Sequence, residues 1–232
     1  YFPETYRSIR ENPRFRTHFL TLNPHLRSAM ASFDHGDQIE VYLHAYLLDP
    51  DLEAAVDKPR IVALVESGAA TLEEVHEADD RMRALGTREG IRFDFDSLII
   101  APTSRAHRVI AAAHDADIDD DTVAGPDSFH LKVAEAIMRS HFEMGLDVSH
   151  PEVLIGCAQD IGMPPDLAAL AVGDEEWASR VYSDYQMAMH MGVASVPTYV
   201  LDGQFLVDGH QTVTAFSNIL ATAWDNARKD RA

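Results

Sequence analysis

The sequence contains a single cysteine, Cys157, among its 232 residues. Dithiol chemistry needs two thiols, because the second thiol resolves the mixed disulfide that the first one forms. The same count excludes a secreted disulfide scaffold and a cysteine-based zinc site. Val153, Cys157 and Ile161 recur at every fourth residue, which is typical of the apolar face of a helix. We therefore predict that Cys157 is a buried structural thiol and not a nucleophile.

Histidines are the other residues that could carry chemistry, as general acids or bases near neutral pH. His107 lies near an expected helix start and His210 follows an expected hairpin, so both are candidates for lining a site. His76 and Asp80 have the i, i+4 spacing of a helical metal pair, but their helix face is acidic and should be solvated. We expect no bound metal. The chain also lacks the Gly-x-Ser-x-Gly turn of a serine hydrolase and a glycine loop for phosphate.

A proline interrupts the most distinctive segment, Gly-Val-Ala-Ser-Val-Pro-Thr-Tyr-Val, which spans residues 192–200. Pro197 stands at the mouth of an expected strand, although proline has no N–H for a ladder. A cis Val196–Pro197 bond would turn the chain and leave the Val196 backbone available to pair with something else. A trans proline as the first strand residue is the other explanation.

Charge and composition limit the classes of partner. The chain has 38 acidic and 19 basic residues, a formal net charge of -19, which would repel nucleic acid and an anionic membrane. Residues 1–30 lack the apolar run of a signal peptide, and no apolar stretch approaches the length of a membrane span. We expect a cytoplasmic protein. Its 46% apolar content suits one large domain or two small ones.

The expected elements are mostly helical. Residues 1–10 resemble a helix, residues 11–37 are irregular, and residues 38–48 alternate like a strand. The pairs Thr71/Glu74 and Ser149/Glu152 have the spacing of capping boxes. Asp202-Gly203 predicts a hairpin turn. The expected helices are 71–89, one from about 103, 127–144, one from about 150 to 161, 174–191 and 212–225, and the expected hairpin strands are 198–201 and 204–207.

These elements predict one sheet and one block of helices. The strand at 38–48 and the hairpin at 198–207 should share a sheet, because a lone strand needs a partner. Residues 1–50 and 174–232 would then form one domain, and residues 51–173 would form an inserted helical domain.

Several motifs resemble the DsbA-like thioredoxin superfamily, and more narrowly its FrnE-like branch of cytosolic oxidoreductases. Gly192–Val200 resembles the cis-proline strand of that family, and residues 46–50 resemble the end of its second strand. Residues 103–108, 141–147 and 209–211 resemble a helix start, a turn and a Gly-Ala-Gln segment, with Pro102 where Asn is usual and His210 where Ala is usual. The resemblance covers about residues 38–224. It implies an α/β thioredoxin-like fold with a large all-helical insertion between the second strand and the cis-proline strand.

The chain departs from the family at its start. The family carries Cys-x-x-Cys just after its first strand, at the N-terminus of its first helix, and neither the motif nor that strand is evident here. Since Tyr1-Phe2 resembles the residues that follow the second cysteine, we expect the strand and the cysteine pair just upstream of Tyr1. Residues 11–37 would then be an insertion, and no catalytic residue would lie within the chain itself.

If the pair exists, the resemblance implies a thiol-disulfide oxidoreductase. A thiolate at a helix N-terminus has a lowered pKa and would attack a protein or small-molecule disulfide. Val196, Pro197 and Thr198 would hold the substrate chain like a neighbouring strand. Tyr1, Phe2, His107 and His210 could line the site. No cofactor is expected.

Two other functions remain open. The chain could be related to 2-hydroxychromene-2-carboxylate isomerases and kappa-class glutathione transferases, which share the fold, use serine and bind glutathione. It could instead be a redox-inactive relative that binds peptides in the same groove. The expected partners are a thiol or disulfide substrate, glutathione or another small thiol, and a second copy in a homodimer, with no nucleic acid or membrane.

Overall fold

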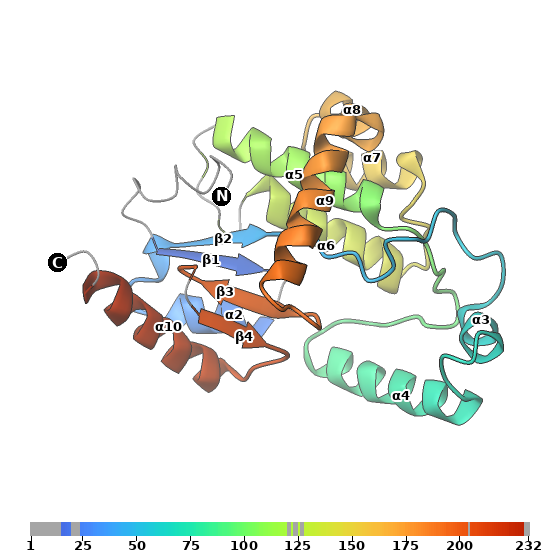
Figure 1. The fold of residues 1–232 in the computed structure, drawn as a ribbon, viewed down its shortest axis with the longest axis horizontal. Coiled ribbons are helices and arrows are strands. Elements are labelled where there is room, and N and C mark those ends of the chain that lie inside the picture. The colour runs from blue at the N-terminus through green and yellow to red at the C-terminus, as the bar shows by residue number, and fades with distance from the viewer. Residues whose placement is uncertain are drawn as a thin grey trace. The chain divides into compact units, whose positions relative to one another are not determined.

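The computed structural model describes residues 15–19, 24–119, 122, 125, 128–203 and 205–229. The chain forms two compact units (Figure 1). We call the first the sheet unit, made from residues up to Leu43 and from Val193 onward. We call the second the helical unit, made from His44–Gly192. The divisions therefore fall after residues 43 and 192, whereas the sequence suggested residues 50 and 173.

A four-stranded sheet in the order β2-β1-β3-β4 is the centre of the sheet unit. Strand β1 (Phe15–Phe19) runs parallel to β2 (Ile39–Leu43) and antiparallel to β3 (Thr198–Leu201), which pairs antiparallel with β4 (Phe205–Asp208). The predicted strand and hairpin thus share one sheet, as expected. They do not pair with each other, because β1 lies between them.

Strand β1 corrects the expectation that the first strand is absent and that residues 11–37 are irregular. A central strand usually reads as a continuous apolar run. Phe-Arg-Thr-His-Phe has polar residues at its three middle positions, so the usual signal is missing. A nine-residue helix, α2 (Pro24–Ser32), follows β1, and a short 3₁₀ turn, η2 (Gly36–Gln38), leads into β2. The predicted helix at residues 1–10 lies outside the described residues.

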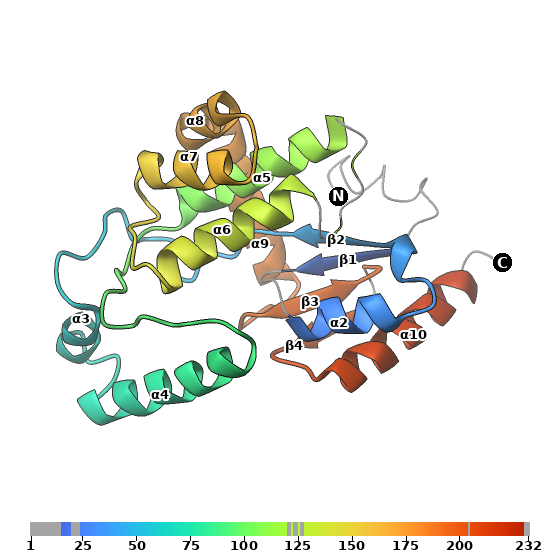
Figure 2. The same cartoon turned by 180° about the vertical axis from the view of Figure 1, so that it is seen from behind.

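The hairpin and the last helix complete the sheet unit. Asp202 and Gly203 have positive φ values of 50° and 69° after the end of β3. Leu201 pairs with Phe205, so the loop is one residue longer than the two-residue turn predicted from Asp202-Gly203. Helix α10 (Val213–Lys229) packs on the sheet through an edge-to-face contact of Phe216 with Tyr199, 4.9 Å between centroids. It also packs against α2 (Figure 2). The helix continues four residues beyond the predicted end at 225.

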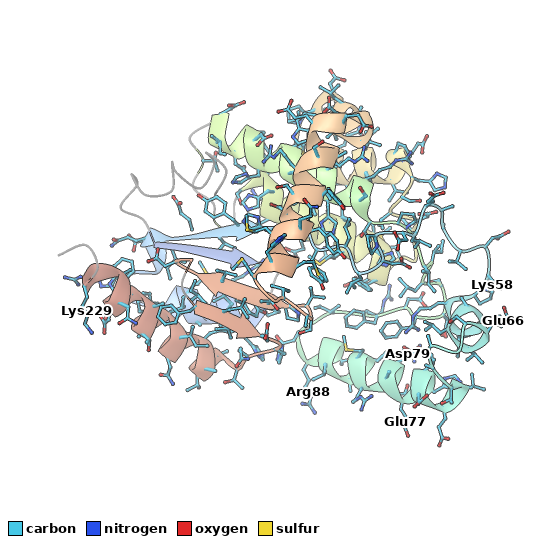
Figure 3. All side chains as sticks on the ribbon, viewed as in Figure 1. Lys58, Glu66, Glu77, Asp79, Arg88 and Lys229 are labelled. Carbon is cyan, nitrogen blue, oxygen red and sulfur yellow. The ribbon has the colours of Figure 1, made fainter. Side chains whose placement is uncertain are left out.

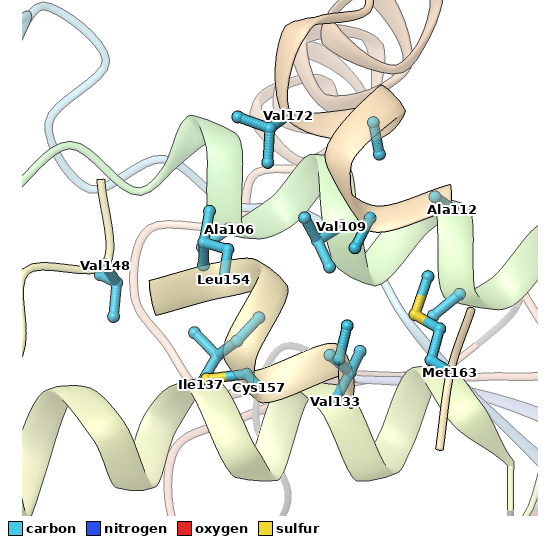
Figure 4. Packing of buried hydrophobic residues seen from close by; sticks show 14 residues of the cluster. Ala106, Val109, Ala112, Val133, Ile137, Val148, Leu154, Cys157, Met163 and Val172 are labelled. Atoms are coloured by element: carbon cyan, nitrogen blue, oxygen red, sulfur yellow. The ribbon is translucent and has the colours of Figure 1, made fainter. Parts of the chain in front are cut away.

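The helical unit is built around α5 (Ser104–Asp119), which packs against α6, α7, α8 and α9. Val109 of α5 and Leu154 of α7 are fully buried in its core (Figure 4). Four of the predicted helices are found within two residues of their expected ends, at α4, α6, α7 and α9. The remaining elements are α3 (Arg60–Glu66), α4 (Leu72–Arg88), α6 (Phe129–Phe142), α7 (Pro151–Asp160), α8 (Pro165–Gly173) and α9 (Glu175–His190).

Only one of the two predicted capping boxes forms. At α4, the Thr71 side chain accepts from the Glu74 N–H and the Glu74 carboxylate accepts from the Thr71 N–H, as predicted. At α7 the N-cap is His150 and no side chain caps the helix. Ser149 instead donates its N–H and hydroxyl to the Asp147 carboxylate, so a nearer acceptor replaces the predicted box.

Among the helices that the structure describes, none combines the length and the apolar character needed to cross a membrane.

Candidate functional site

The loop before β3 adopts one of the two conformations left open by the sequence: the Val196–Pro197 peptide bond is cis. Val196 and Pro197 are half-buried, while Thr198 begins β3 and is buried. The loop therefore lies at the end of a central strand of the sheet, where its backbone meets solvent.

Thr198 holds this loop in place. Its hydroxyl lies 2.7 Å from the Ser195 carbonyl oxygen and 2.8 Å from a carboxylate oxygen of Asp208, its partner across the hairpin. One hydroxyl hydrogen can serve only one of these two acceptors at a time. The Pro197 carbonyl accepts from the Gly209 N–H at 2.7 Å. The loop is thus attached to the end of β4 from both sides.

Val196 differs from its neighbours in its hydrogen bonding. Among the described residues, neither its N–H nor its C=O makes a hydrogen bond, although both adjacent carbonyls, of Ser195 and Pro197, are used. A buried backbone group normally finds a partner. The half-buried Val196 therefore offers one donor and one acceptor to an extended chain placed beside it.

The connection from β1 to α2 is where the resembling family carries its thiol pair. In this chain residues 20–23 make that connection, with the sequence Leu-Thr-Leu-Asn, and they lie outside the described residues. Helix α2 then begins at Pro24, a position that suits proline because the N–H there has no intrahelical partner. No cysteine or serine occurs between the end of β1 and Pro24.

His210 is exposed, and the structure brings it to a residue that the sequence did not suggest, His25. The two rings lie 4.7 Å apart between centroids. His25 is in the first turn of α2, and its Nδ1 lies 2.8 Å from the Gln211 carbonyl oxygen. Because α2 itself was not predicted, no sequence signal placed His25 near the hairpin.

The other predicted site residues are elsewhere. Tyr1 and Phe2 lie outside the described residues. His107 belongs to the helical unit, on α5, whereas Val196, Pro197, Thr198 and His210 belong to the sheet unit. Burial lowers the pKa of His107 to about 4, against the opposing attraction of the Asp184 carboxylate. The ring is therefore neutral near pH 7.

A second polar arrangement in the helical unit joins the residue after β2 to α9. The Nδ1 atom of His44 lies 3.1 Å from one carboxylate oxygen of Asp184, and the other oxygen accepts from the Ala45 N–H at 3.1 Å. Burial raises the pKa of Asp184, but the bonds from His44 and Ala45 outweigh it and leave this pKa lowered. The carboxylate thus fixes the chain where it enters the helical unit.

Cys157 is buried on α7, as predicted. Its Sγ lies 3.2 Å from the Ser140 Oγ, and burial raises the pKa of the thiol. A neutral thiol in the core is inert toward disulfides. In the part of the chain that the structure describes, no three His, Cys, Asp or Glu side chains gather in a way that could hold a metal ion.

A sheet of order β2-β1-β3-β4, with a cis proline before β3 and a helical block between β2 and β3, defines a thioredoxin-fold protein of the DsbA type. The family described as DSBA-like thioredoxin domain matches residues 20–221, and the chain belongs to this family. The narrower FrnE-like branch stays a prediction. A comparison with curated proteins gave no match.

Solved structures share this fold. A probable DsbA oxidoreductase from Streptomyces coelicolor is 22% identical with a TM-score of 0.76, covering 91% of each chain. The cytosolic disulfide reductase DsbM from Pseudomonas aeruginosa is 17% identical with a TM-score of 0.57, covering 90% of this chain and 98% of that one. A 2-hydroxychromene-2-carboxylate isomerase is 11% identical with a TM-score of 0.52, covering 93% and 98%. At these identities the likeness concerns the fold alone.

Proposed function

We propose that this protein binds an extended polypeptide segment at Val196, as a substrate-binding member of the DSBA-like family. The observation that carries the proposal is the backbone of Val196, whose N–H and C=O have no hydrogen bond among the described residues. A peptide laid beside this residue would pair with it as a short added strand. Thr198 and the Pro197–Gly209 bond hold the loop in a fixed position for that pairing.

The chemistry of these 232 residues favours binding over exchange. Exchange needs a thiolate that attacks the substrate disulfide, releasing one substrate thiolate, and a second thiol that displaces the other substrate sulfur and closes an intramolecular disulfide. The chain has one cysteine, Cys157, which is buried and protonated. It can supply neither the exposed thiolate nor the second thiol.

A thiol-disulfide oxidoreductase is the second candidate, favoured by membership of the family. It requires a cysteine pair outside these residues, which the sequence led us to expect just before Tyr1. The position of strand β1 in the chain disagrees with that expectation. A pair before Tyr1 would precede β1, whereas the family carries its pair after the first strand, at the position of residues 20–23 here. We therefore propose exchange only as the second candidate.

A backbone substitution with a matched control tests the binding proposal. Val196→Pro replaces the side chain and removes the N–H, whereas Val196→Ala shortens the side chain and keeps the N–H. The probe is a fluorescently labelled, reduced and carboxymethylated polypeptide, followed by anisotropy. We expect Val196→Ala to bind like the parent and Val196→Pro to bind about tenfold more weakly, the value of one hydrogen bond at the upper end of its usual range.

Equal affinity of the two variants would refute strand-like pairing at Val196. Displacement of the polypeptide by glutathione alone would favour the glutathione-binding relatives. Reduction of insulin disulfides by the protein, together with more than one titratable thiol per denatured chain, would establish the oxidoreductase.

A further inference from the structure

One side of helix α4 is covered by the chain itself. Val75, Asp79 and Gly86 are buried on this side. The segment after the helix folds back here, since the Ile91 N–H donates to the Gly86 carbonyl and a Cβ on Gly86 would overlap the Phe93 ring. Among the described helices, the main neighbour of α4 is the short α3. Most other residues of α4 are exposed.

A second apolar stripe runs along the exposed surface of α4. Ala78, Met82 and Leu85 have the i, i+4, i+7 spacing that places residues on one face of a helix. Ala78 is half-buried, whereas Met82 and Leu85 are 43% and 47% exposed. Side chains at this spacing form a seam of the kind that one helix buries against another.

The charges of α4 are separated along its length. Every acidic residue precedes every arginine: the acids are Glu73, Glu74, Glu77, Asp79 and Asp80, and the arginines are Arg81, Arg83 and Arg88. The helix dipole favours this order only in the first and last turns. Because Glu77 and Arg81 continue the order between those turns, the dipole alone does not account for it.

Three of these charges are unpaired in the part of the chain that the structure describes. The side chains of Glu77, Arg81 and Arg88 are exposed and make no ion pair or hydrogen bond there. Glu77 and Arg88 extend from the same side of α4, opposite Asp79 (Figure 3). They are therefore available to another molecule.

A second copy of α4, in antiparallel orientation, matches both the stripe and the charges. In a two-fold dimer the same surface meets itself, so each contact occurs twice. Pairing about Met82 sets Ala78 of one copy beside Leu85 of the other. Glu77 lies five positions before Met82 and Arg88 lies six positions after it, so the same pairing brings these opposite charges level with each other. Parallel pairing would instead set like charges together.

We propose that two copies of this protein associate through α4, in antiparallel orientation about Met82, as a weak two-fold dimer. A standard interface has about 20–30 residues on each side, more than one face of a 17-residue helix provides. The dissociation constant should therefore be of the order of 10 µM. The contact is independent of peptide binding at Val196, so either proposal can fail alone.

Sedimentation velocity of the full chain at about 0.15 M salt tests the dimer. We expect the parent to change from monomer to dimer between about 1 and 300 µM. Arg88→Glu should weaken dimerisation by about tenfold or more, because it replaces two attractive contacts with repulsive ones. Arg228→Glu is the matched control, since it makes the same charge change at an exposed position in the last turn of another helix, α10. This variant should dimerise like the parent.

A mixing experiment identifies the charges that meet. Glu77→Arg alone should also weaken the dimer. An equimolar mixture of the Glu77→Arg and Arg88→Glu variants should associate like the parent, because every contact between the two again joins opposite charges. Circular dichroism checks that each variant is folded, and the parent needs no such check.

Three results would overturn the proposal. The first is a parent that stays monomeric up to about 300 µM. The second is a dimer that neither Arg88→Glu nor Glu77→Arg weakens, which would place the interface elsewhere. The third is a mixture of the two folded variants that associates no better than each variant alone.

Discussion

The carboxylate of Asp117, in the last turn of α5, caps the start of α6 and binds the side chain of His130 at the same time. One oxygen accepts from the Phe129 N–H at 2.7 Å. The other accepts from the His130 N–H at 3.0 Å and lies 2.8 Å from His130 Nδ1. Asp117 and His130 are 1% and 0% exposed. A residue from one helix therefore supplies the N-terminal cap of the next.

Asp117→Ala should destabilise the helical unit by about 3 kcal/mol, because buried donors that lose their acceptor cost about 1–3 kcal/mol each. Urea unfolding followed by circular dichroism measures this loss. Asp119→Ala, two residues on and exposed, is the control and should leave the midpoint unchanged. Equal midpoints for the two variants would show that the cap contributes nothing.

The same carboxylate should make the helical unit sensitive to acid. Burial raises the pKa of Asp117, but the bonds from His130 and Phe129 outweigh it and lower the pKa overall. A lowered folded pKa means that its stabilisation is complete above the unfolded value of about 3.9 and disappears as the pH falls through the folded value. Urea midpoints measured from pH 6 downward should converge for the parent and Asp117→Ala only below that unfolded value.

His107 should remain neutral well below the pH at which a free histidine is protonated. Burial lowers its pKa from 6.5 to about 4. Between these two pH values His107 is protonated in the unfolded chain and neutral in the folded chain. The free energy of unfolding should therefore fall as the pH drops from about 6.5 to about 4. The NMR shift of the His107 ring should be constant down to about pH 5. A midpoint near 6.5 for His107 would contradict its burial.

The Arg60–Asp79 pair should join α3 to α4. The two terminal guanidinium nitrogens of Arg60 each donate to one carboxylate oxygen of Asp79 at 2.9 Å. Asp79 points to the opposite side of α4 from Glu77 and Arg88 (Figure 3). Because Arg60 and Asp79 are 18% and 8% exposed, removing one leaves a nearly buried charge unpaired. We expect Asp79→Ala to cost about 3 kcal/mol.

A double-mutant cycle isolates this interaction. The Arg60→Met, Asp79→Leu double variant should be more stable than either single variant, because no unpaired charge remains. Arg60→Lys should recover only part of the stability, since lysine cannot bind both oxygens. Strict additivity of the two single effects would contradict coupling between them.

Cys157 should react with thiol reagents only after the helical unit opens. Its burial and raised pKa both suppress the thiolate. We expect labelling of the native protein to be more than about tenfold slower than labelling in denaturant. Ser183→Cys adds a thiol at an exposed position of α9 as the control, which should label at once. Equal rates for the two thiols would contradict the core position of Cys157.

The elements with strong local signals were predictable. The hairpin follows from Asp202-Gly203, and the start of α4 follows from Thr71 and Glu74, because both signals act within four residues. The burial of Cys157 followed from its helical spacing. The buried stripe, however, consists of Leu154, Cys157 and Ala158, and Val153 and Ile161 are only half-buried.

The features that the sequence did not predict depend on contacts between residues that are distant in the chain. Strand β1 has no apolar pattern, and its place is set by pairing with β2 and β3, which come from both ends of the chain. His25 meets His210 only because α2 packs beside the segment after β4. The same holds for His44 and Asp184, which are 140 positions apart in the chain and carry no shared motif.

The division into two units also sets an order for folding during synthesis. The helical unit is one continuous stretch, so all its packing partners have been made once Gly192 leaves the ribosome. Strands β1 and β2 are made first. One edge of β1 stays unpaired until β3 is made, which happens after the whole helical unit. Domains generally fold as their chains emerge. The helical unit should therefore fold while the early strands are still incomplete, which makes those strands the part of the nascent protein that most needs protection.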